Sequence, residues 1–338
     1  MAGTLQVEST RGDIVESVHR VSLAVVDAMG RLVMAAGNPD LVTFWRSAAK
    51  PFQAMPLVAD GAADHFGFDS RDLALACASH SSEPVHLEVA EGMLRKVGLP
   101  ERALACGTHP PISPTVADDV VRHGVMLTPK WSNCSGKHAG MLATAVHHGW
   151  RLQGYNELAH PLQQRIVAEI ERWTDCPAGR MTFAVDGCAA ACFGLPLRAM
   201  SLAYARFGIS EEPAAIRLRQ AMADHPELVA GQGRLCTDLG IATRGDAIAK
   251  IGADGIYCAA LPKAGLGIAL KVEDGDMESS PPALLFVLRA LAARHALGFD
   301  PAALPETVTR HAEIPTLNTR GTTTGVLRAT GHLQSPAP

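Results

Sequence analysis

The strand-like segments of this chain fall into two groups, one near each end of the sequence, and this distribution constrains the fold most. Residues 5–35 alternate apolar and polar side chains around a turn at Met29-Gly30, a pattern typical of an antiparallel hairpin. Three further short runs are separated by tight turns, at 246–251, 255–261 and 266–272. Because tight turns join antiparallel strands, the sequence predicts a mainly antiparallel sheet.

Amphipathic segments lie between these two groups and predict helices. They cover residues 47–59, 84–97, 137–148, 161–173 and 211–223, and a strongly apolar helix over 282–297 could cover the sheet. Clustered strands with helices before and between them favour an α+β fold, an antiparallel sheet flanked by helices. Residues 315–338 are rich in Thr, Gly and Pro and are expected to form a terminal strand and a loose tail.

The length of 338 residues and the 47% hydrophobic content allow a large core. We expect one catalytic unit over residues 1–338, with a division into two subdomains left open. The mainly helical part would cover about 40–235, and the sheet-bearing part about 5–40 plus 236–325.

Charge and cysteine usage narrow the class of protein. The net charge is −4 and the charged residues are interspersed, which does not suggest a binder of nucleic acid or of membrane surfaces. The chain shows no secretory start and no apolar run of about 18 residues, so we expect a cytoplasmic protein. Eight cysteines spread through such a chain are expected to be reduced and mostly buried.

Ser47 and Lys50 form a Ser-x-x-Lys motif at the start of the predicted helix 47–59. Residues one helical turn apart share a face, so the hydroxyl and the amine are expected to lie together. Serine needs a nearby base to become a good nucleophile, and lysine can serve when burial keeps its amine neutral. The apolar neighbours Trp45 and Phe52 favour burial. A helix-capping serine followed by a solvated lysine is the alternative.

Ser79 and Lys250 could complete such a site. Ser79 opens the turn 79–82 after an apolar run and is expected to expose its hydroxyl, while Lys250 closes a strand-like run. Penicillin-recognising acyl-serine enzymes use a similar set: a Ser-x-x-Lys helix start, a second serine on a loop and a lysine-bearing strand edge. The alternatives are a helix cap for Ser79 and an exposed strand lysine for Lys250.

Five strings, taken together and in this order, make the chain resemble the rhizobial-type (class 3) L-asparaginases of the asparaginase II family. The resemblance runs from about residue 10 to about 325. The strings are Arg46-Ser47-Ala48-Ala49-Lys50-Pro51-Phe52-Gln53, Ala78-Ser79-His80-Ser81, Asn133-Cys134-Ser135-Gly136-Lys137-His138-Ala139-Gly140-Met141, Val185-Asp186-Gly187-Cys188 and Lys250-Ile251-Gly252-Ala253-Asp254-Gly255.

The resemblance implies an amidohydrolase that converts L-asparagine and water to L-aspartate and ammonia. It also implies a fold similar to serine β-lactamases and glutaminases, a homodimer, and two Ser–Lys pairs. Ser47 with Lys50 and Ser79 with Lys250 match these pairs, although Lys263 in the neighbouring turn is an alternative to Lys250.

The family further carries a zinc ion held by two cysteines and a lysine, which match Cys134, Lys137 and Cys188. Spacing alone would instead favour Cys134, His138 and Cys188, since histidine is the commoner zinc ligand. Two buried free cysteines without a metal are the third possibility. The zinc is expected to support substrate binding, and the sequence leaves open whether turnover requires it. Residues of family motifs expected to contact the substrate or line its pocket are Arg46, His138, Asp186 and Cys236.

The sequence therefore leads to a working mechanism. Ser47, ahead of Ser79, attacks the side-chain amide of asparagine while Lys50 takes its proton, and Lys250 helps to lower the pKa of Lys50. Ser79 passes a proton to the departing ammonia. Asp186 would hold the substrate's ammonium, and Arg46 or His138 its carboxylate. The competing hypotheses are a β-lactamase- or peptidase-like acyl-serine enzyme and a non-enzymatic zinc–thiol protein.

Overall fold

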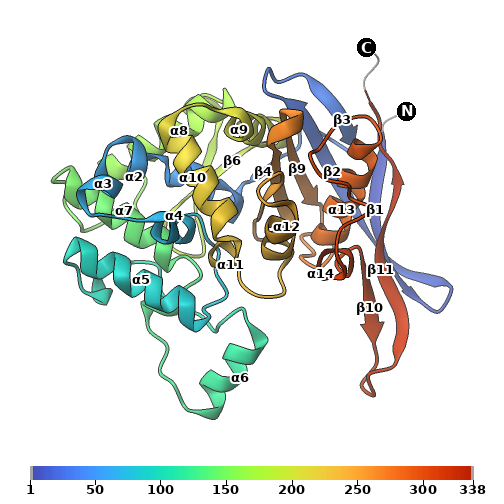
Figure 1. Cartoon of the computed structure of the whole chain (residues 1–338), viewed down its shortest axis with the longest axis horizontal. Helices are drawn as coiled ribbons and strands as arrows, with labels where there is room; N and C mark the ends of the chain where they lie inside the picture. Colours follow the sequence, from blue (N-terminus) through green and yellow to red (C-terminus); the bar gives the residue numbers. More distant parts are fainter. Residues whose placement is uncertain (1–2, 336–338) are drawn as a thin grey trace. The chain divides into compact units, whose positions relative to one another are not determined.

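The computed structural model describes residues 3–335 and divides into two compact units, each built from separate stretches of the chain. The sheet unit comprises residues 3–48, Leu195–Ile209 and residues 238–335. The helical unit comprises Ala49–Gly194 and Ser210–Thr237. Figure 1 shows the strands of the first unit and the helices of the second.

The sheet unit is organised around an antiparallel sheet of eight strands within residues 3–335. Its order is β10-β11-β1-β2-β9-β8-β7, and β3 pairs with β2 off this path. All of the pairings that make up this sheet are antiparallel, which confirms the predicted class of architecture. The strands are β1 (Thr4–Arg11), β2 (Ile14–Asp27), β3 (Leu32–Ala36), β7 (Ile248–Ile251), β8 (Ile256–Leu261), β9 (Leu266–Val272), β10 (Glu313–Leu317) and β11 (Thr323–His332), and the short β4 (Val42–Phe44) belongs to the same unit.

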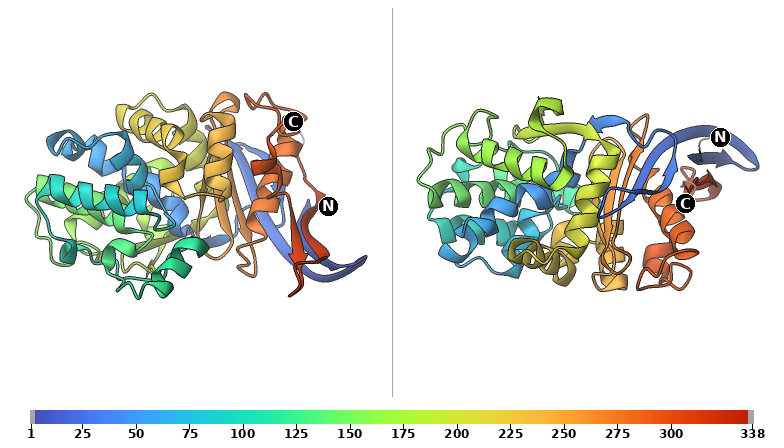
Figure 2. Two further views of the ribbon diagram at one scale, coloured as in Figure 1. Left: turned by 60° about the horizontal axis from the view of Figure 1, so that its bottom comes forward. Right: turned by 90° about the horizontal axis from the view of Figure 1, so that it is seen from above.

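Two helices cover the opposite faces of this sheet, α9 (Leu197–Ile209) and α13 (Ser280–Ala292) (Figure 2, right). The approach of α9 depends on Gly267 of β9, where a Cβ atom would lie 1.9 Å from the carbonyl oxygen of Ser201. The Ser201 hydroxyl donates a hydrogen bond to the Gly267 carbonyl at 2.7 Å. This packing places Leu195–Ile209 with the sheet, whereas the sequence assigned it to the helical part at about 40–235.

The helical unit is built around α7 (Ser135–His147), whose residues Ser135–Ala145 are all buried. The helices that pack on α7 include α4 (Ser70–Ala76) and α5 (Pro84–Val97). Gly136 permits the contact with α4, because a Cβ atom there would lie 2.4 Å from the Leu75 carbonyl oxygen. The remaining elements of the unit are α1 (Lys50–Gln53), α2 (Met55–Ala59), α3 (Ala62–His65), α6 (Pro114–Arg122), α8 (Pro161–Thr174), α10 (Pro213–Asp224), α11 (Pro226–Val229), β5 (Thr182–Val185) and the start of β6 (Ala191–Pro196).

The main differences from the predicted elements have local causes. The apolar run before Ser79, for which no helix was predicted, forms α4, because Asp69 caps this helix by accepting hydrogen bonds from the backbone amides of Arg71 and Asp72. The last part of the chain forms two paired strands, β10 and β11, rather than one. The expected tail at 336–338 lies outside the described residues.

Candidate active site

Lys50 is the first residue of α1 and is completely buried in the helical unit. Its Nζ atom lies 2.8 Å from the Ser79 hydroxyl oxygen and 3.2 Å from the Asn133 carbonyl oxygen. It also donates a hydrogen bond to the Ala78 carbonyl oxygen. The amine of the Ser-x-x-Lys motif is therefore held by uncharged oxygen partners, and the Cys134 thiol also lies within hydrogen-bonding reach.

These partners suit an uncharged amine. A neutral amine has two N–H donors and one lone pair, and carbonyl oxygens can only accept. Both N–H groups can thus go to Ala78 and Asn133, which leaves the lone pair to accept the Ser79 hydroxyl proton. Burial lowers the pKa of Lys50 from its ordinary value of 10.5, and the nearby Lys137 lowers it further against the influence of Cys134 and Cys188.

Ser79 is buried, so the expectation of an exposed hydroxyl was wrong. It follows directly on the end of α4, and its backbone is bound on both sides. The Ser79 amide donates to the Val229 carbonyl at 3.0 Å, and Arg234 Nη1 donates to the Ser79 carbonyl at 2.6 Å. The same guanidinium nitrogen also donates to the Ala230 carbonyl at 3.1 Å. The segment 229–234 thereby fixes the hydroxyl that faces Lys50.

Two thiols and a second lysine lie beside this pair. Cys134 is the N-cap residue of α7, Lys137 lies in the first turn of α7, and Cys188 lies in the turn between β5 and β6. Lys137 Nζ is 3.0 Å from Cys188 Sγ. Cys134, Lys137 and Cys188 all act electrostatically on Lys50, so the Ser–Lys pair and the thiols belong to one site.

The two thiols are electrically different. The adjacent Cys134 thiol, followed by the charge of Lys137 and the nearby His138 ring, holds the pKa of Cys188 far below its usual value against the effect of burial. The pKa of Cys134 is raised by the adjacent Cys188 thiol and by burial. Burial lowers the pKa of Lys137, but the two cysteines and Asp186 outweigh it and raise the net value. The arrangement brings two thiols and an amine together, and the Cys188 thiol is the more acidic of the two.

This donor set fits a zinc ion. Thiolates and a nitrogen lone pair are zinc ligands, and metal binding would release the proton of Lys137. Among residues 3–335, no group of three or more His, Cys, Asp or Glu side chains is arranged to hold a metal ion. Both ligand sets considered from the sequence, with Lys137 or with His138 as the nitrogen donor, stay predictions.

His138 is completely buried and lies next to the thiols. Its Nδ1 atom is 2.6 Å from the Tyr155 hydroxyl oxygen. Its Nε2 atom makes no hydrogen bond of standard geometry to any described residue, although Cys188 lies close enough to influence the ring.

Asp186 is half-buried beside this cluster, with its carboxylate bound to the backbone amide of Gly187 at 2.9 Å. Cys236 of α12 (Leu235–Thr243) is buried in the helical unit.

Three of the predicted residues lie in the sheet unit. Ser47 is half-buried on the 3₁₀ helix Arg46–Ala49. Arg46 adopts a left-handed backbone conformation with φ of 52° and donates to the Asp254 carboxylate. Lys250 of β7 is completely buried, and its Nζ donates to the Ile251 carbonyl at 3.0 Å. The alternative Lys263 is 59% exposed and pairs with Asp246, which suits it less well to an amine that must stay neutral.

A comparison with known families decides the identity. A sequence profile of the family described as L-asparaginase II matches residues 7–329, nearly the whole chain. The chain belongs to the L-asparaginase II family. It is therefore an amidohydrolase of the L-asparaginase type, with asparagine as the substrate that the family implies. No curated protein matches the chain.

Solved structures similar to this L-asparaginase II family member carry β-lactamase and penicillin-binding-protein descriptions. A β-lactamase from Mycobacterium bovis is 13% identical, with a TM-score of 0.33, over 76% of this chain and 88% of that chain. A putative β-lactamase from Bacteroides dorei is 13% identical, with a TM-score of 0.37, over 85% and 93%. An octameric penicillin-binding protein homologue from Pyrococcus abyssi is 13% identical, with a TM-score of 0.38, over 89% and 80%.

Three contributions to the site of this family member were missed by sequence reasoning. They are the Asn133 carbonyl, Tyr155 and Arg234, which contact Lys50, His138 and Ser79 respectively. Tyr155 lies in the connection between α7 and α8, where no periodic pattern points to a function. Arg234 follows the Gly231-Gln232-Gly233 stretch, and this glycine-rich turn was the one available signal.

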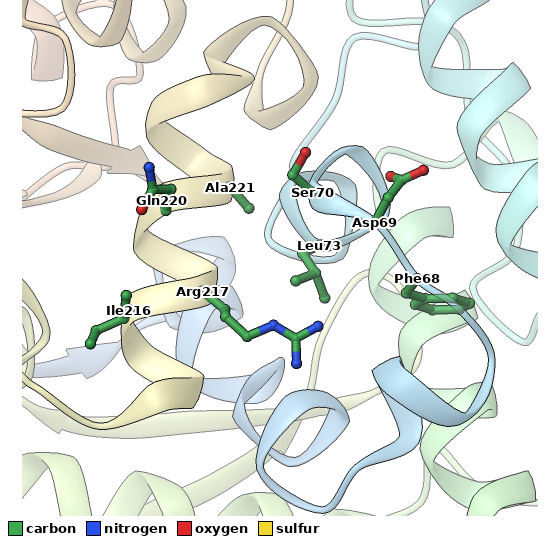
Figure 3. Close-up of a pocket in the computed structure, with 8 residues that line it drawn as sticks. All are labelled: Phe68, Asp69, Ser70, Leu73, Ile216, Arg217, Gln220 and Ala221. Atoms are coloured by element: carbon green, nitrogen blue, oxygen red, sulfur yellow. The ribbon is translucent and has the colours of Figure 1, made fainter.

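A separate surface pocket of about 280 Å³ lies between α4 and α10, away from these residues (Figure 3). Arg217 extends from α10 toward α4 and forms an ion pair with Asp64 at 2.9 Å. Asp69, on the opposite wall, is the cap of α4. None of the predicted site residues lines this pocket. Its charged side chains instead stabilise the neighbouring helices, Asp69 as a cap and Arg217 through its ion pair.

The structure also bears on two further expectations, the absence of membrane-spanning helices and the reduced, buried state of the cysteines. In the described part of the chain, no helix combines the length and apolar character that crossing a membrane requires. The cytoplasmic location stays a prediction. All eight cysteines are free and buried, as expected from their distribution.

Proposed function

We propose that this protein hydrolyses L-asparagine to L-aspartate and ammonia through an acyl-enzyme formed on a serine. Membership of the L-asparaginase II family supports the substrate class. The observation that carries the mechanism is the buried Lys50 amine, 2.8 Å from the Ser79 hydroxyl and with its pKa lowered by burial. A neutral lysine held against a hydroxyl is a general base ready to accept a proton.

In the first step, Ser47 attacks the side-chain carbonyl carbon of asparagine and Lys50 takes the hydroxyl proton. Two observations support Ser47 as the nucleophile: it precedes Lys50 by three residues, and it is half-exposed whereas Ser79 is buried. A nucleophile must be reachable by its substrate, while a proton relay need not be. The step forms a C–O bond, moves the π electrons of the carbonyl onto its oxygen to give a tetrahedral intermediate, and leaves Lys50 as an ammonium.

In the second step, Ser79 relays the proton. The Lys50 ammonium donates to the Ser79 hydroxyl, which in turn donates to the amide nitrogen of the tetrahedral intermediate. The C–N bond breaks and ammonia leaves, so that an aspartyl ester of Ser47 remains. Water then attacks this ester while Lys50 takes a proton from it. The C–O bond to Ser47 breaks, the proton returns from Lys50 to the Ser47 oxygen, and aspartate is released. The pairing of Ser79 with Lys250 and the effect of Lys250 on Lys50 stay predictions.

We further propose a zinc ion held by Cys134, Lys137 and Cys188. When bound, it would supply a positive charge that helps to orient the substrate's carboxylate. The contact of 3.0 Å between Lys137 Nζ and Cys188 Sγ supports this ligand set. Asp186 is the candidate partner of the substrate's ammonium. Arg46 or His138 is the candidate partner of its carboxylate, and Cys236 would form a wall of the pocket.

The homodimer implied by the family resemblance is also part of this proposal, and sedimentation analysis tests it.

A coupled ammonia assay with asparagine, glutamine and buffer tests the proposed reaction. We expect ammonia from asparagine with the wild-type protein. Ser47→Ala should lower turnover by roughly 10⁴–10⁶-fold, as loss of a nucleophile does, and Ser79→Ala by about 10²–10⁴-fold, as loss of a proton-transfer group does. The matched control is Ser17→Ala, which removes an exposed hydroxyl on β2.

The outcomes separate the hypotheses. Near-normal activity of Ser47→Ala would exclude it as the nucleophile, and a larger loss in Ser79→Ala would assign that role to Ser79. Absence of ammonia release from the folded wild-type protein, with zinc retained, would contradict the amidohydrolase proposal and favour a zinc–thiol protein.

A further inference from the structure

Arg234 is a half-buried residue between α11 and α12, in the helical unit. One nitrogen of its guanidinium, Nη1, is fixed by backbone carbonyls: it lies 2.6 Å from the Ser79 oxygen and 3.1 Å from the Ala230 oxygen. It is also 3.4 Å from the Ser81 hydroxyl oxygen. The guanidinium is thus held against the turn that carries the Ser79 hydroxyl.

The other nitrogens of this guanidinium remain available. A guanidinium carries five N–H groups, of which two belong to Nη1. In residues 3–335, all hydrogen bonds of the Arg234 side chain go through Nη1, so the N–H groups of Nε and Nη2 have no partner there. Polar groups in a half-buried place are satisfied by water or by a ligand.

Arg234 also has no carboxylate partner in the described part of the chain. Glu83, whose carboxylate lies beside the same segment, accepts a hydrogen bond from the Gln232 amide at 2.9 Å. The charge of Arg234 is therefore felt in the interior. Burial, above all, lowers the pKa of His80, and the charges of Lys50 and Arg234 contribute to that lowering. A half-buried cation of this kind favours an anionic ligand.

We propose that Arg234 binds the α-carboxylate of the substrate through its Nε and Nη2 N–H groups. The inference rests on the proposed function, because it takes asparagine as the ligand. Guanidinium and carboxylate groups pair in a fork of two parallel hydrogen bonds. In asparagine only two carbon atoms separate the carboxylate from the side-chain amide. A ligand whose amide lies at the Ser79 hydroxyl therefore has its carboxylate a short distance from that residue, where the guanidinium is anchored.

The charge balance of the two arginines supports this role for Arg234. Arg46, which was expected from the sequence to contact the substrate, donates to the Asp254 carboxylate, and that negative charge offsets its own. A substrate carboxylate at Arg46 would share one cation with a second anion. Arg234 has no such competitor among the described residues, and its anchored Nη1 reduces the side-chain entropy that binding would cost.

Calorimetric titration with two ligands tests the contact without turnover. L-Aspartate and 3-aminopropanoic acid differ only in the α-carboxylate. We expect the wild-type protein to bind L-aspartate more tightly, and Arg234→Gln to weaken L-aspartate binding by roughly 10–100-fold, as loss of a charge-assisted hydrogen bond does. Binding of 3-aminopropanoic acid should change by less than about threefold, because it lacks the group that Arg234 contacts.

Two further variants complete the binding experiment. The matched control is Arg151→Gln, which removes an exposed guanidinium of the same unit and should leave both affinities unchanged. If Arg234→Gln does not fold, Arg234→Lys takes its place, since it keeps the charge but not the fork, and its loss should again be confined to L-aspartate. Equal losses for both ligands, unchanged L-aspartate binding, or a wild type without preference for L-aspartate would overturn the inference.

Kinetics separate this inference from the proposed reaction. With asparagine, Arg234→Gln should raise KM more than it lowers kcat. A fall in kcat at unchanged KM would mean that Arg234 only holds Ser79 in place, and would overturn the inference while the reaction stands. If the wild type released no ammonia but the two ligands behaved as expected, the reaction would be wrong and the carboxylate contact would stand.

Discussion

Lys50 shows how much of the chemistry depends on the surroundings of a single residue. Its oxygen partners are two carbonyls and a hydroxyl, and it is completely buried. The charged form of an amine is disfavoured in such a place because no carboxylate compensates for lost hydration. The motif Ser-x-x-Lys predicted that this lysine would be buried and basic. It did not predict that the Lys50 amine would form a hydrogen bond with the Ser79 hydroxyl.

The pH dependence of turnover follows from the lowered pKa of Lys50. Only the neutral amine can accept a proton, so kcat/KM should rise with pH until Lys50 is deprotonated, and this limb should lie below the ordinary lysine pKa of 10.5. Lys50→Arg keeps a charge whose pKa exceeds about 12 and should lose roughly 10²–10⁴-fold in activity without recovery at alkaline pH. Activity profiles of both proteins from pH 6 to about pH 10 check this. A wild-type profile without an acid limb would contradict a lysine base.

Sequence reasoning at the scale of single residues was limited by contacts between distant segments. Cys134, Lys137 and Cys188 were identified from family motifs, and the structure brings Lys137 and Cys188 within 3.0 Å. The burial of Ser79 could not be read from its polar neighbours, because it depends on Val229 and Arg234, about 150 residues later.

At the scale of elements, α7 is the helix that carries the site. It starts at the Cys134 cap, presents Lys137 and His138 in its first turns, and is buried along most of its length. Its apolar periodicity made the helix predictable from sequence. Its register against α4 was not predictable, because that register is set by Gly136, where the helix touches the Leu75 backbone. Residues 71–77 were likewise not recognised as a helix, since seven residues are too few for a periodic pattern.

Gly136→Ala tests this contact. The added Cβ would lie 2.4 Å from the Leu75 carbonyl oxygen, so α4 and α7 must separate, and we expect a loss of about 2–3 kcal/mol in the free energy of unfolding. Gly92→Ala in α5 is the matched control, because its Cβ meets no atom closer than 3.7 Å. That variant should gain roughly 0.5–1 kcal/mol from helix propensity. Urea unfolding measures both, and equal stabilities of the two variants would contradict the close packing.

At the scale of the whole molecule, the path of the chain explains which boundaries between the two units could be predicted from the sequence and which could not. The chain passes between the two units four times, after residues 48, 194, 209 and 237. Alternation and turn signals located the strands of the sheet unit, and helical periodicity located most of the helical unit. The assignment of α9 to the sheet could not be made from its own sequence, because it depends on the absence of a side chain at Gly267. Whether the chain works as one catalytic unit stays a prediction.

The proposed zinc site links binding to the stability of the helical unit, since Cys134 and Lys137 belong to α7 and Cys188 to the turn between β5 and β6. A ligand that binds only the folded protein stabilises it by about 4 kcal/mol at a thousandfold excess over Kd. At about 2–4 °C per kcal/mol, this corresponds to a rise in Tm of roughly 8–16 °C. We expect that rise when zinc is added to chelator-treated protein in scanning calorimetry, and not with magnesium, which prefers oxygen ligands. Cys134→Ser should show little or no rise. An equal shift in that variant would place the metal elsewhere, and no shift in the wild type would remove zinc from the proposed site.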